Sequence, residues 1–307
     1  MNGILNIDKP KDKTSFSVVA LIKRLSGEKR VGHAGTLDPA ATGVLPVCLG
    51  QGTRVIEFLM DTTKVYLAEI ELGITTDTYD TTGKITQIGD HLSVSQEQLV
   101  SALTLYRGLI EQTPPMYSSV KHQGKPLYQL ARAGITIERK SRPATIYDLE
   151  LVDWQPPLFT IQVTCGKGTY IRSLAYDIGQ TLGCGATLKS LVRLRYGTFD
   201  IKNAVSLPHL EDAFRHAYWQ HLIYPVDTVL SHWPAMVVSD ATGQAIRNGC
   251  PLPPGNSVEK LLNQEYCPPL STASKTHCRA YDESGCFLGA LRFNPERKQW
   301  QPEKVFL

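Results

Sequence analysis

The segment Gly32–Pro46 (GHAGTLDPAATGVLP) places a single carboxylate, Asp38, in a loop whose backbone is constrained on both sides. Gly35 permits a bend that other residues resist, and Pro39 pushes the residue before it away from helical geometry. An aspartate held in this way could act as a nucleophile or as a base. It could equally be a turn former, because Asp is common in turns for local reasons. The segment alone leaves both interpretations open.

A second charged residue of interest, Arg172, belongs to the segment Cys165–Gly179 (CGKGTYIRSLAYDIG). This segment predicts a strand end, a glycine-containing turn and a helix that starts at Tyr170. Arg172 falls in the first turn of that helix, where the helix dipole disfavours a cation. A partner carboxylate would account for its position. The alternative is an exposed arginine that costs little.

His33 lies in the same loop segment and could stack on a base, carry a proton or fill space. No second His or Cys lies near it at ligand spacing, so we expect no metal site. The seven cysteines include no C-x-x-C pair, which argues against both a zinc ribbon and a disulfide framework. We expect most of them to be buried, reduced thiols.

Helices and strands with apolar faces are expected to hold these residues in place. Apolar spacing predicts helices over Thr14–Leu25 and Gln96–Arg107. Alternation predicts a strand over Val65–Leu72, on which Tyr66 shares a face with apolar residues and points toward the core. The run Val44–Leu49 predicts a strand that is bent or at a sheet edge, because a proline interrupts it.

The stretch from Tyr117 to Pro143 is strongly basic, with six Lys or Arg against one acid. Cations meet phosphates and aromatic rings meet bases, so the mixture suits a nucleic acid surface. We therefore expect Lys121 to bind substrate, whereas the alternative is a solvated basic loop. The cations are Lys121, Lys125, Arg132, Arg139, Lys140 and Arg142, and the interleaved aromatic residues are Tyr117 and Tyr128.

The chain has 307 residues, a net charge of +3, 42% hydrophobic residues and 20% charged residues, which suits a globular protein longer than one typical domain. Mixed helices and strands predict an α+β domain over residues 1–230. A boundary is expected near Ser231–Pro234, and the short alternating runs after it predict a β-rich domain over residues 231–307. No run of 18 apolar residues and no apolar signal core occurs, so we expect a cytoplasmic protein without a membrane span.

The segment Gly32–Arg54 (GHAGTLDPAATGVLPVCLGQGTR) resembles the signature of the TruB family, the pseudouridine synthases that modify uridine 55 in the T arm of tRNA. The end of the chain (WQPEKVF) resembles the PUA-type RNA-binding domain that follows in this family. The resemblance covers nearly the whole chain. Further segments agree in order: GILNIDKP at Gly3–Pro10, KVYLAEIELGITTDTYDTTG at Lys64–Gly83, PPMYSSVKHQGKPLYQLARAG at Pro114–Gly134, CGKGTYIRSLAYDIG at Cys165–Gly179 and GCGATLKSLVRLRYGTF at Gly183–Phe199.

The resemblance implies a pseudouridine synthase catalytic fold of class α+β. A central mixed, mainly antiparallel sheet would be flanked by helices and followed by the PUA-type domain, and residues 114–142 would form an insert that clamps RNA. In the family the Arg pairs with the catalytic Asp, which would hold the pKa of Asp38 below its ordinary value of about 3.9. The implied catalytic residues are Asp38, Tyr66 and Arg172, and the implied substrate-binding residues are Tyr170, Leu191 at the wall of the uridine pocket, Asp80 on the RNA, His33 in the T loop and Lys9 as a support of the site.

The implied reaction is the isomerisation of uridine 55 to pseudouridine in the T loop, by a monomer that needs neither cofactor nor metal. One alternative is a guide-RNA-dependent synthase inside a ribonucleoprotein, but the basic insert favours a stand-alone enzyme. Another is a tRNA-binding chaperone with an inactive catalytic fold, against which the intact set of Asp38, Tyr66 and Arg172 argues. A sugar hydrolase is not favoured, because paired carboxylates would be expected and the loop offers one.

Overall fold

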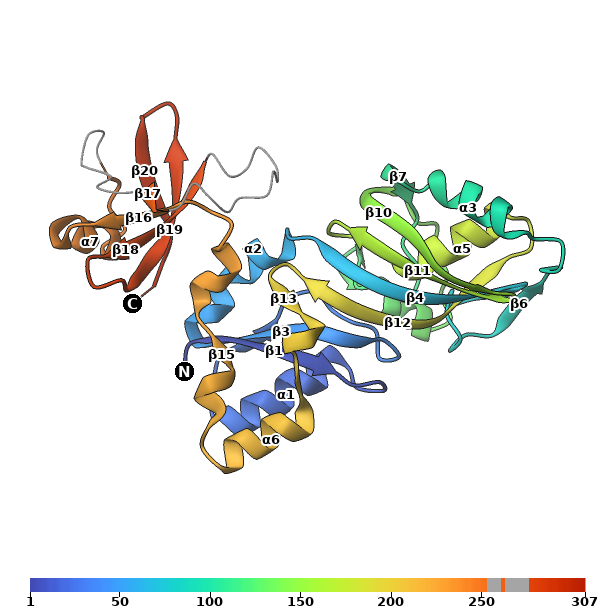
Figure 1. Ribbon diagram of the computed structural model, residues 1–307, viewed down its shortest axis with the longest axis horizontal. Helices are drawn as coiled ribbons and strands as arrows, with labels where there is room; N and C mark the ends of the chain where they lie inside the picture. The colour runs from blue at the N-terminus through green and yellow to red at the C-terminus, as the bar shows by residue number, and fades with distance from the viewer. Residues whose placement is uncertain (253–260, 263–275, 307) are drawn as a thin grey trace.

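The computed structural model describes residues 1–252, 261–262 and 276–306 (Figure 1). A sheet of eleven strands runs through the larger part of the molecule, and a sheet of five strands lies near the C-terminus. Among the described residues, no helix combines the length and apolar character needed to cross a membrane.

The large sheet is mixed and mainly antiparallel, as predicted. Its strands are β1 (Gly3–Lys9), β2 (Val31–His33), β3 (Thr42–Leu49), β4 (Lys64–Leu72), β7 (Gly108–Gln112), β10 (Arg142–Gln155), β11 (Leu158–Cys165), β12 (Ala186–Tyr196), β13 (Phe199–Asp200), β14 (Val205–Ser206) and β15 (Ile223–Tyr224). The main path is β14-β1-β3-β12-β4-β11-β10-β7, while β2, β13 and β15 pair with β3, β12 and β1. The pairs β1–β14 and β3–β12 are parallel.

Two helices pack on the β1–β3 end of the sheet, α1 (Ser15–Ser26) and α6 (Leu207–Arg215) (Figure 1). The Thr14 side chain accepts the Ser17 N–H at 2.9 Å and so caps the start of α1. Gly27, at φ 65°, ends it in the left-handed conformation that favours glycine. The predicted helix over Thr14–Leu25 is confirmed, and its apolar stripe, including Val18 and Ile22, is buried against the sheet.

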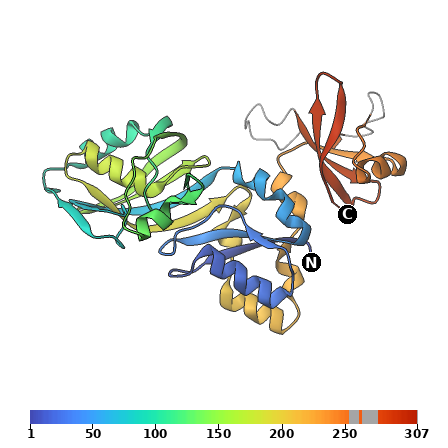
Figure 2. The same cartoon turned by 180° about the vertical axis from the view of Figure 1, so that it is seen from behind.

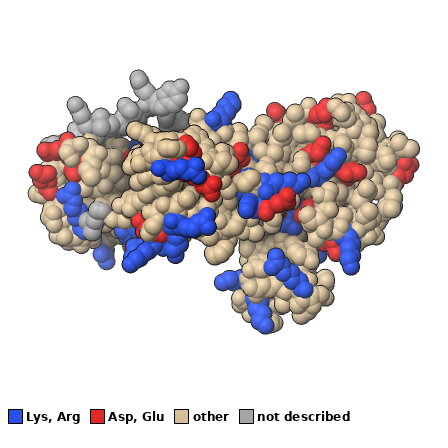
Figure 3. Space-filling view, turned by 90° about the horizontal axis from the view of Figure 1, so that it is seen from below, with Lys and Arg blue, Asp and Glu red and all other residues tan. Residues whose placement is uncertain are grey.

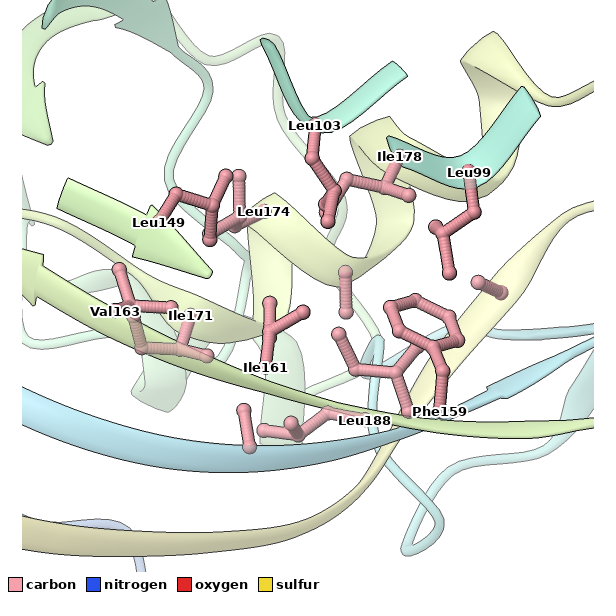
Figure 4. Packing of buried hydrophobic residues seen from close by; sticks show 14 of the residues in the cluster. Leu99, Leu103, Leu149, Phe159, Ile161, Val163, Ile171, Leu174, Ile178 and Leu188 are labelled. Carbon is pink, nitrogen blue, oxygen red and sulfur yellow. The ribbon is translucent and has the colours of Figure 1, made fainter. Parts of the chain in front are cut away.

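Helices α3 (Gln96–Thr104) and α5 (Ile171–Thr181) cover the other half of the sheet (Figure 4). Leu99 and Leu103 of α3 meet Leu174 and Ile178 of α5, above apolar side chains of β11 such as Ile161. Helix α3 ends at Thr104, three residues before the predicted end. The N–H groups of Leu105, Tyr106 and Arg107 bond to carbonyl oxygens three residues back instead of four, and Gly108, at φ 86°, then turns the chain into β7.

Of the two forms expected for the proline-containing strand β3, bent or at a sheet edge, the structure excludes the edge. Strand β3 lies inside the sheet and not at an edge, with β1 on one side and β12 and β2 on the other. On that second side β12 pairs with Thr42 and Gly43, and β2 pairs from Val47 onward. Pro46 lies between these two pairings. Proline has no N–H to donate to a neighbouring strand, and on this side of β3 its position falls where the neighbour changes from β12 to β2.

The chain between β7 and β10 makes a long excursion outside the strand order of the large sheet (Figure 2), and this is the region where residues 114–142 were expected to form an insert. The insert contains a small hairpin, β8 (Lys121–His122) with β9 (Lys125–Pro126), and the short helix α4 (Leu127–Arg132). A second two-stranded ribbon, β5 (Ile74–Thr76) with β6 (Ile85–Ile88), follows β4. In the space-filling view a projecting lobe shows Lys and Arg as its visible charged side chains (Figure 3).

The C-terminal sheet has the order β17-β16-β18-β19-β20 and carries one helix. Its elements are β16 (Ala235–Val238), α7 (Asp240–Arg247), β17 (Leu261–Leu262), β18 (His277–Asp282), β19 (Phe287–Asn294) and β20 (Gln299–Val305). Five short helices in the described part of the chain connect the large sheet to it or border it: η1 (Gly50–Val55), α2 (Ile56–Met60), η2 (Ile201–Asn203), η3 (Trp219–Leu222) and η4 (Val226–Leu230). The predicted strands around Cys278–Tyr281 and Phe287–Leu291 are thus confirmed.

The two sheets share a hydrophobic cluster. Val55 and Leu59, from η1 and α2, are buried together with Ala290 and Phe306 of the C-terminal part. Trp233 lies between them, with its ring 5.1 Å from Phe58 edge-on and 4.7 Å from the stacked His277 ring. The Tyr281 hydroxyl also donates to Asp227 at 2.6 Å, and Lys304 pairs with Glu57 at 2.6 Å. These contacts fix one sheet against the other.

Trp233→Ala is expected to loosen this junction. Truncation of a buried aromatic residue costs about 3–5 kcal/mol, and here the loss falls between the two sheets. Urea unfolding followed by circular dichroism should change from one transition to two. Phe16→Ala is the control, because that ring is 77% exposed and its removal should leave the curve in place. A single, unshifted transition for Trp233→Ala would contradict the shared core.

Candidate active site

The loop between β2 and β3 carries Asp38 and is anchored on both sides of it. The Lys9 ammonium is buried and donates to three carbonyl oxygens, including that of Pro39 at 3.1 Å. The Ser15 hydroxyl binds both the N–H and the carbonyl oxygen of Leu37, at 2.9 and 3.2 Å. Burial lowers the pKa of Lys9 to about 8. Through these hydrogen bonds Lys9, at the end of β1, holds in place the residue that follows Asp38.

Asp38 and Arg172 form a two-point ion pair. Arg172 Nε lies 2.9 Å from Asp38 Oδ2, and its terminal nitrogen donates to Asp38 Oδ1 at 3.1 Å. The Arg172 side chain is 6% exposed and that of Asp38 is 40% exposed. Such paired bonds fix a carboxylate in direction as well as place. The pairing confirms the expectation that a carboxylate partner explains a cation at the start of α5.

The two terminal nitrogens of Arg172 also contact two other segments of the chain. They reach the carbonyl oxygens of Tyr117 at 2.7 Å and Thr78 at 3.3 Å, and the Asp80 carboxylate at 3.7 Å. Asp80 is held in turn by the Thr78 hydroxyl at 2.7 Å. Asp80 therefore lies in the charge network of the site, and Tyr117 joins the insert to it.

The pKa of Asp38 departs from the sequence-based expectation. Burial raises it above its ordinary value, and the nearby Asp80 carboxylate adds to the rise, while Arg172 opposes both. We expected the arginine to dominate and the pKa to fall. The expectation was wrong in sign because a sequence shows the partner cation but not the desolvation of the carboxylate or its second acidic neighbour.

Tyr66 and Leu191 both lie at the junction of two core clusters. They stand on the neighbouring strands β4 and β12, and both are half-buried and pack against each cluster. Burial raises the pKa of the Tyr66 hydroxyl above its ordinary value. Tyr170 caps the start of α5, where Gln112 of β7 binds both its N–H at 2.7 Å and its carbonyl oxygen at 3.0 Å. Gln112 thereby links the stem of the insert to the helix that carries Arg172.

Two predicted site residues lie outside this cluster. His33 is half-buried on β2, and its Nδ1 is buried without a hydrogen bond among the described residues. Lys121 is exposed on β8 of the insert. Within the described residues no three His, Cys, Asp or Glu side chains gather in a way that could hold a metal ion.

Sequence reasoning missed Arg193, which is 1% exposed on β12. Its terminal nitrogens lie 3.5 Å from the Tyr66 hydroxyl and 3.0 Å from the Gly35 carbonyl oxygen of the Asp38 loop. Strand periodicity would give Arg193 and Arg195 the same face, yet Arg195 is exposed. A shift in the β12–β4 register between these two residues separates them. The position within the family-like segment was the only available signal.

Two glycines of the loop permit its close approach to β12. Gly35 has φ 63°, and a Cβ there would come within 2.8 Å of the Tyr196 hydroxyl. Gly43 has φ 99°, and a Cβ there would lie 2.3 Å from the Arg193 carbonyl oxygen. Both the backbone conformation and the space exclude a side chain. Glycine is therefore required at these two positions because β12 passes so close to them.

The comparisons with known proteins agree with this geometry. Residues 23–171 match the N-terminal domain of the TruB family pseudouridylate synthases, and residues 172–231 match the tRNA pseudouridylate synthase B C-terminal domain. Together with relatives that are 39–49% identical over the full chain, these matches show that the chain belongs to the TruB family of pseudouridylate synthases.

Among these relatives is a protein of Dehalococcoides mccartyi called tRNA pseudouridine synthase B, which is 49% identical over 100% of this chain and 97% of its own. A protein of Clostridium perfringens with the same name is 39% identical over 100% of this chain and 99% of its own. Among solved structures, one chain of a Cbf5-Nop10-Gar1 complex superposes with a TM-score of 0.76 at 26% identity, covering 99% of this chain and 85% of that one. The predicted pseudouridine synthase fold is confirmed.

Asp80→Asn is expected to lower the pKa of Asp38, because it removes the negative charge that opposes ionisation of the neighbouring carboxyl. The pKa is measured by 13C NMR of the Asp side-chain carboxyl carbons in the free protein. Asp148→Asn on β10 is the control, since Asp148 is not among the groups that shift Asp38. An unchanged or higher Asp38 pKa in Asp80→Asn would show that the two carboxylates are not coupled.

Proposed function

We propose that this chain is a tRNA pseudouridine synthase, an isomerase that converts uridine 55 in the T loop of tRNA to pseudouridine with Asp38 as its catalytic carboxylate. The observation that carries the proposal is the partly exposed Asp38 held by the buried Arg172 at 2.9 Å. The tRNA substrate is supported by the relatives called tRNA pseudouridine synthase B. The position of the target uridine follows from the resemblance of the motif loop.

The reaction detaches uracil from the ribose at N1, rotates it, and attaches it again through C5. Asp38 can attack C1′ of the ribose, act as a base on the sugar, or add to C6 of the ring. Each route starts from an ionised carboxylate. Arg172 keeps Asp38 in that form and in one orientation through two hydrogen bonds, against the burial that favours protonation.

The last step requires a base. When C5 has bonded to C1′, the C5–H bond must break; its electron pair forms the C5=C6 bond, and N1 takes a proton. We assign this removal to Tyr66, half-buried on β4: its oxygen takes the C5 proton while its own hydroxyl proton leaves to water, and its ring stacks on the base. Leu191 and Tyr170 form walls that keep water from the detached uracil, because its escape would leave an abasic site.

Recognition of RNA is assigned to His33, to the insert and to Asp80. A base that leaves its stack costs a few kcal/mol, and stacking on an aromatic side chain returns about 1–3 kcal/mol. His33 fills the space that the uridine leaves in the T loop, and Asp80 contacts the RNA from the charge network. The insert, with Lys121 on its exposed hairpin, clamps the RNA.

The organisation of the chain completes the proposal. Residues 1–230 form the catalytic domain and residues 231–307 a PUA-like RNA-binding domain, and the protein works as a monomer in the cytoplasm, where tRNA is processed. A guide-RNA-dependent enzyme is the alternative, since a solved structure of similar fold belongs to a Cbf5-Nop10-Gar1 complex. The insert with its own cations favours the stand-alone enzyme, which should modify an unmodified T-arm hairpin without other components.

Asp38→Asn tests the catalytic assignment. The amide keeps the size and can still accept from Arg172, so tRNA binding should persist, whereas turnover should fall by about 10⁴-fold or more because the reacting carboxylate is gone. Pseudouridine is measured by sequencing after incubation of the pure protein with tRNA. Asp12→Asn, an exposed acid near the same loop, should remain active. Turnover near wild type in Asp38→Asn would remove Asp38 from the mechanism.

A variant with Lys121, Lys125 and Arg132 all changed to Gln tests the clamp. Each phosphate contact contributes about 0.7–0.9 to the slope of log K against log salt, so the slope should fall by about 2–3. A variant with Lys23, Arg24 and Lys29 changed to Gln is the matched control, because it removes three exposed cations at α1, far from the insert in the chain. Equal salt slopes in the insert variant and the wild type would contradict an RNA clamp.

A further inference from the structure

Arg193 is one of the largest fully buried side chains of the molecule, and its burial needs a reason. A buried arginine is usually stabilised by a carboxylate, because charge in a low-dielectric interior is unfavourable without one. Within the described residues no ion pair of Arg193 occurs. Its guanidinium is instead surrounded by neutral acceptors and by the Tyr196 ring, whose centroid lies 4.7 Å away.

The neutral acceptors come from the parts of the molecule that form the active site. Nε donates to the Val44 carbonyl oxygen at 2.7 Å, just after the Asp38 loop enters β3. One terminal nitrogen donates to the Gly35 carbonyl oxygen at 3.0 Å, three residues before Asp38. The other lies 3.5 Å from the Tyr66 hydroxyl on β4. One side chain therefore contacts both ends of the catalytic loop and the proposed base.

The direction of the Tyr66 contact has a chemical consequence. A guanidinium can only donate, so the Tyr66 oxygen must accept, and its own proton points elsewhere. A positive charge at this oxygen favours the phenolate over the phenol. The Arg193 charge does lower the pKa of Tyr66, in opposition to the burial that raises it. The charge acts on the atom that must receive the C5 proton.

We propose that Arg193 is a positioning residue for the isomerisation: it fixes the Tyr66 hydroxyl against the Asp38 loop and stabilises negative charge on the Tyr66 oxygen. Arg172 orients the Asp38 carboxylate, and Arg193 orients the Tyr66 hydroxyl. Lysine cannot replace it fully, because a single ammonium lacks the planar fork that reaches Val44, Gly35 and Tyr66 together. The inference rests on the proposed function in one respect, that Tyr66 acts as a base in the reaction. The effect of Arg193 on the Tyr66 hydroxyl is a property of the protein without RNA.

The electrostatic part is tested without RNA. With 3-fluorotyrosine in place of Tyr66, the 19F signal reports ionisation of that hydroxyl. Arg193→Met should raise the pKa of the hydroxyl relative to the parent protein, and Arg193→Lys should raise it less, because the charge is kept. Arg195→Met is the matched control on the same strand, since Arg195 is exposed and should leave the titration unchanged. A titration that does not move in folded Arg193→Met overturns the proposal.

The catalytic part is tested by a double-mutant cycle with full-length tRNA. Arg193→Lys should lower kcat by about 10²-fold, the scale of one acid–base contribution, with KM close to wild type. The same change on a Tyr66→Phe background should have little further effect, because the hydroxyl on which Arg193 acts is absent. Equal losses of kcat on both backgrounds would mean that Arg193 only supports the fold, and would overturn the proposal even if Arg193→Met does not fold.

Failure of the inference and failure of the proposed function are distinguishable. Wild-type protein that makes no pseudouridine in tRNA would refute the function and leave the 19F titration interpretable. Active wild-type protein with an unchanged titration in Arg193→Met would refute the inference alone.

Discussion

The ion pair between Asp38 and Arg172 is the contact on which the rest of the site depends. It joins residues 134 positions apart, one in a loop and one in the first turn of a helix. A guanidinium that is 6% exposed would be costly without its carboxylate, because breaking a buried pair leaves an uncompensated charge. The buried Lys9 and Ser15 hold the loop in place, and packing of α5 on the sheet holds the arginine.

A second buried cation complements the first. Arg193 reaches the Tyr66 hydroxyl and the Gly35 carbonyl oxygen, while Arg172 reaches Asp38 and Asp80. The two arginines lie on different elements, β12 and α5, so Asp38 and Tyr66, the two groups proposed to react, are oriented by separate parts of the core. In a low-dielectric setting such fixed charges act strongly and need no rearrangement during reaction.

The segments proposed to bind RNA are tied to this centre by the same kind of contact. Arg172 binds the Tyr117 carbonyl oxygen of the insert, and Gln112 binds the Tyr170 backbone at the stem of the insert. A displacement of the insert would therefore change the surroundings of the Asp38–Arg172 pair. At the other end, the cluster around Trp233 and Phe306 fixes the C-terminal sheet to the large one. An RNA that contacts both sheets would then bind two parts that are already fixed relative to each other, so little free energy would be spent on ordering them.

The sequence by itself determined the helices and strands with clear periodicity, such as α1 and β4, and the position of Asp38 within a family-like loop. It also marked Arg172 as a cation at an unfavourable helix start, for which a carboxylate partner was one of two explanations. These are local properties: spacing, capping and backbone restriction act within a few residues.

Only the tertiary structure decided the rest. It placed the proline-containing strand β3 inside the sheet, where the neighbouring strand changes from β12 to β2. It separated the buried Arg193 from the exposed Arg195 by a shift in register, and it reversed the expected direction of the Asp38 pKa through burial and Asp80. Desolvation and electrostatic coupling depend on which residues surround a group in space, and those neighbours come from segments far apart in the chain.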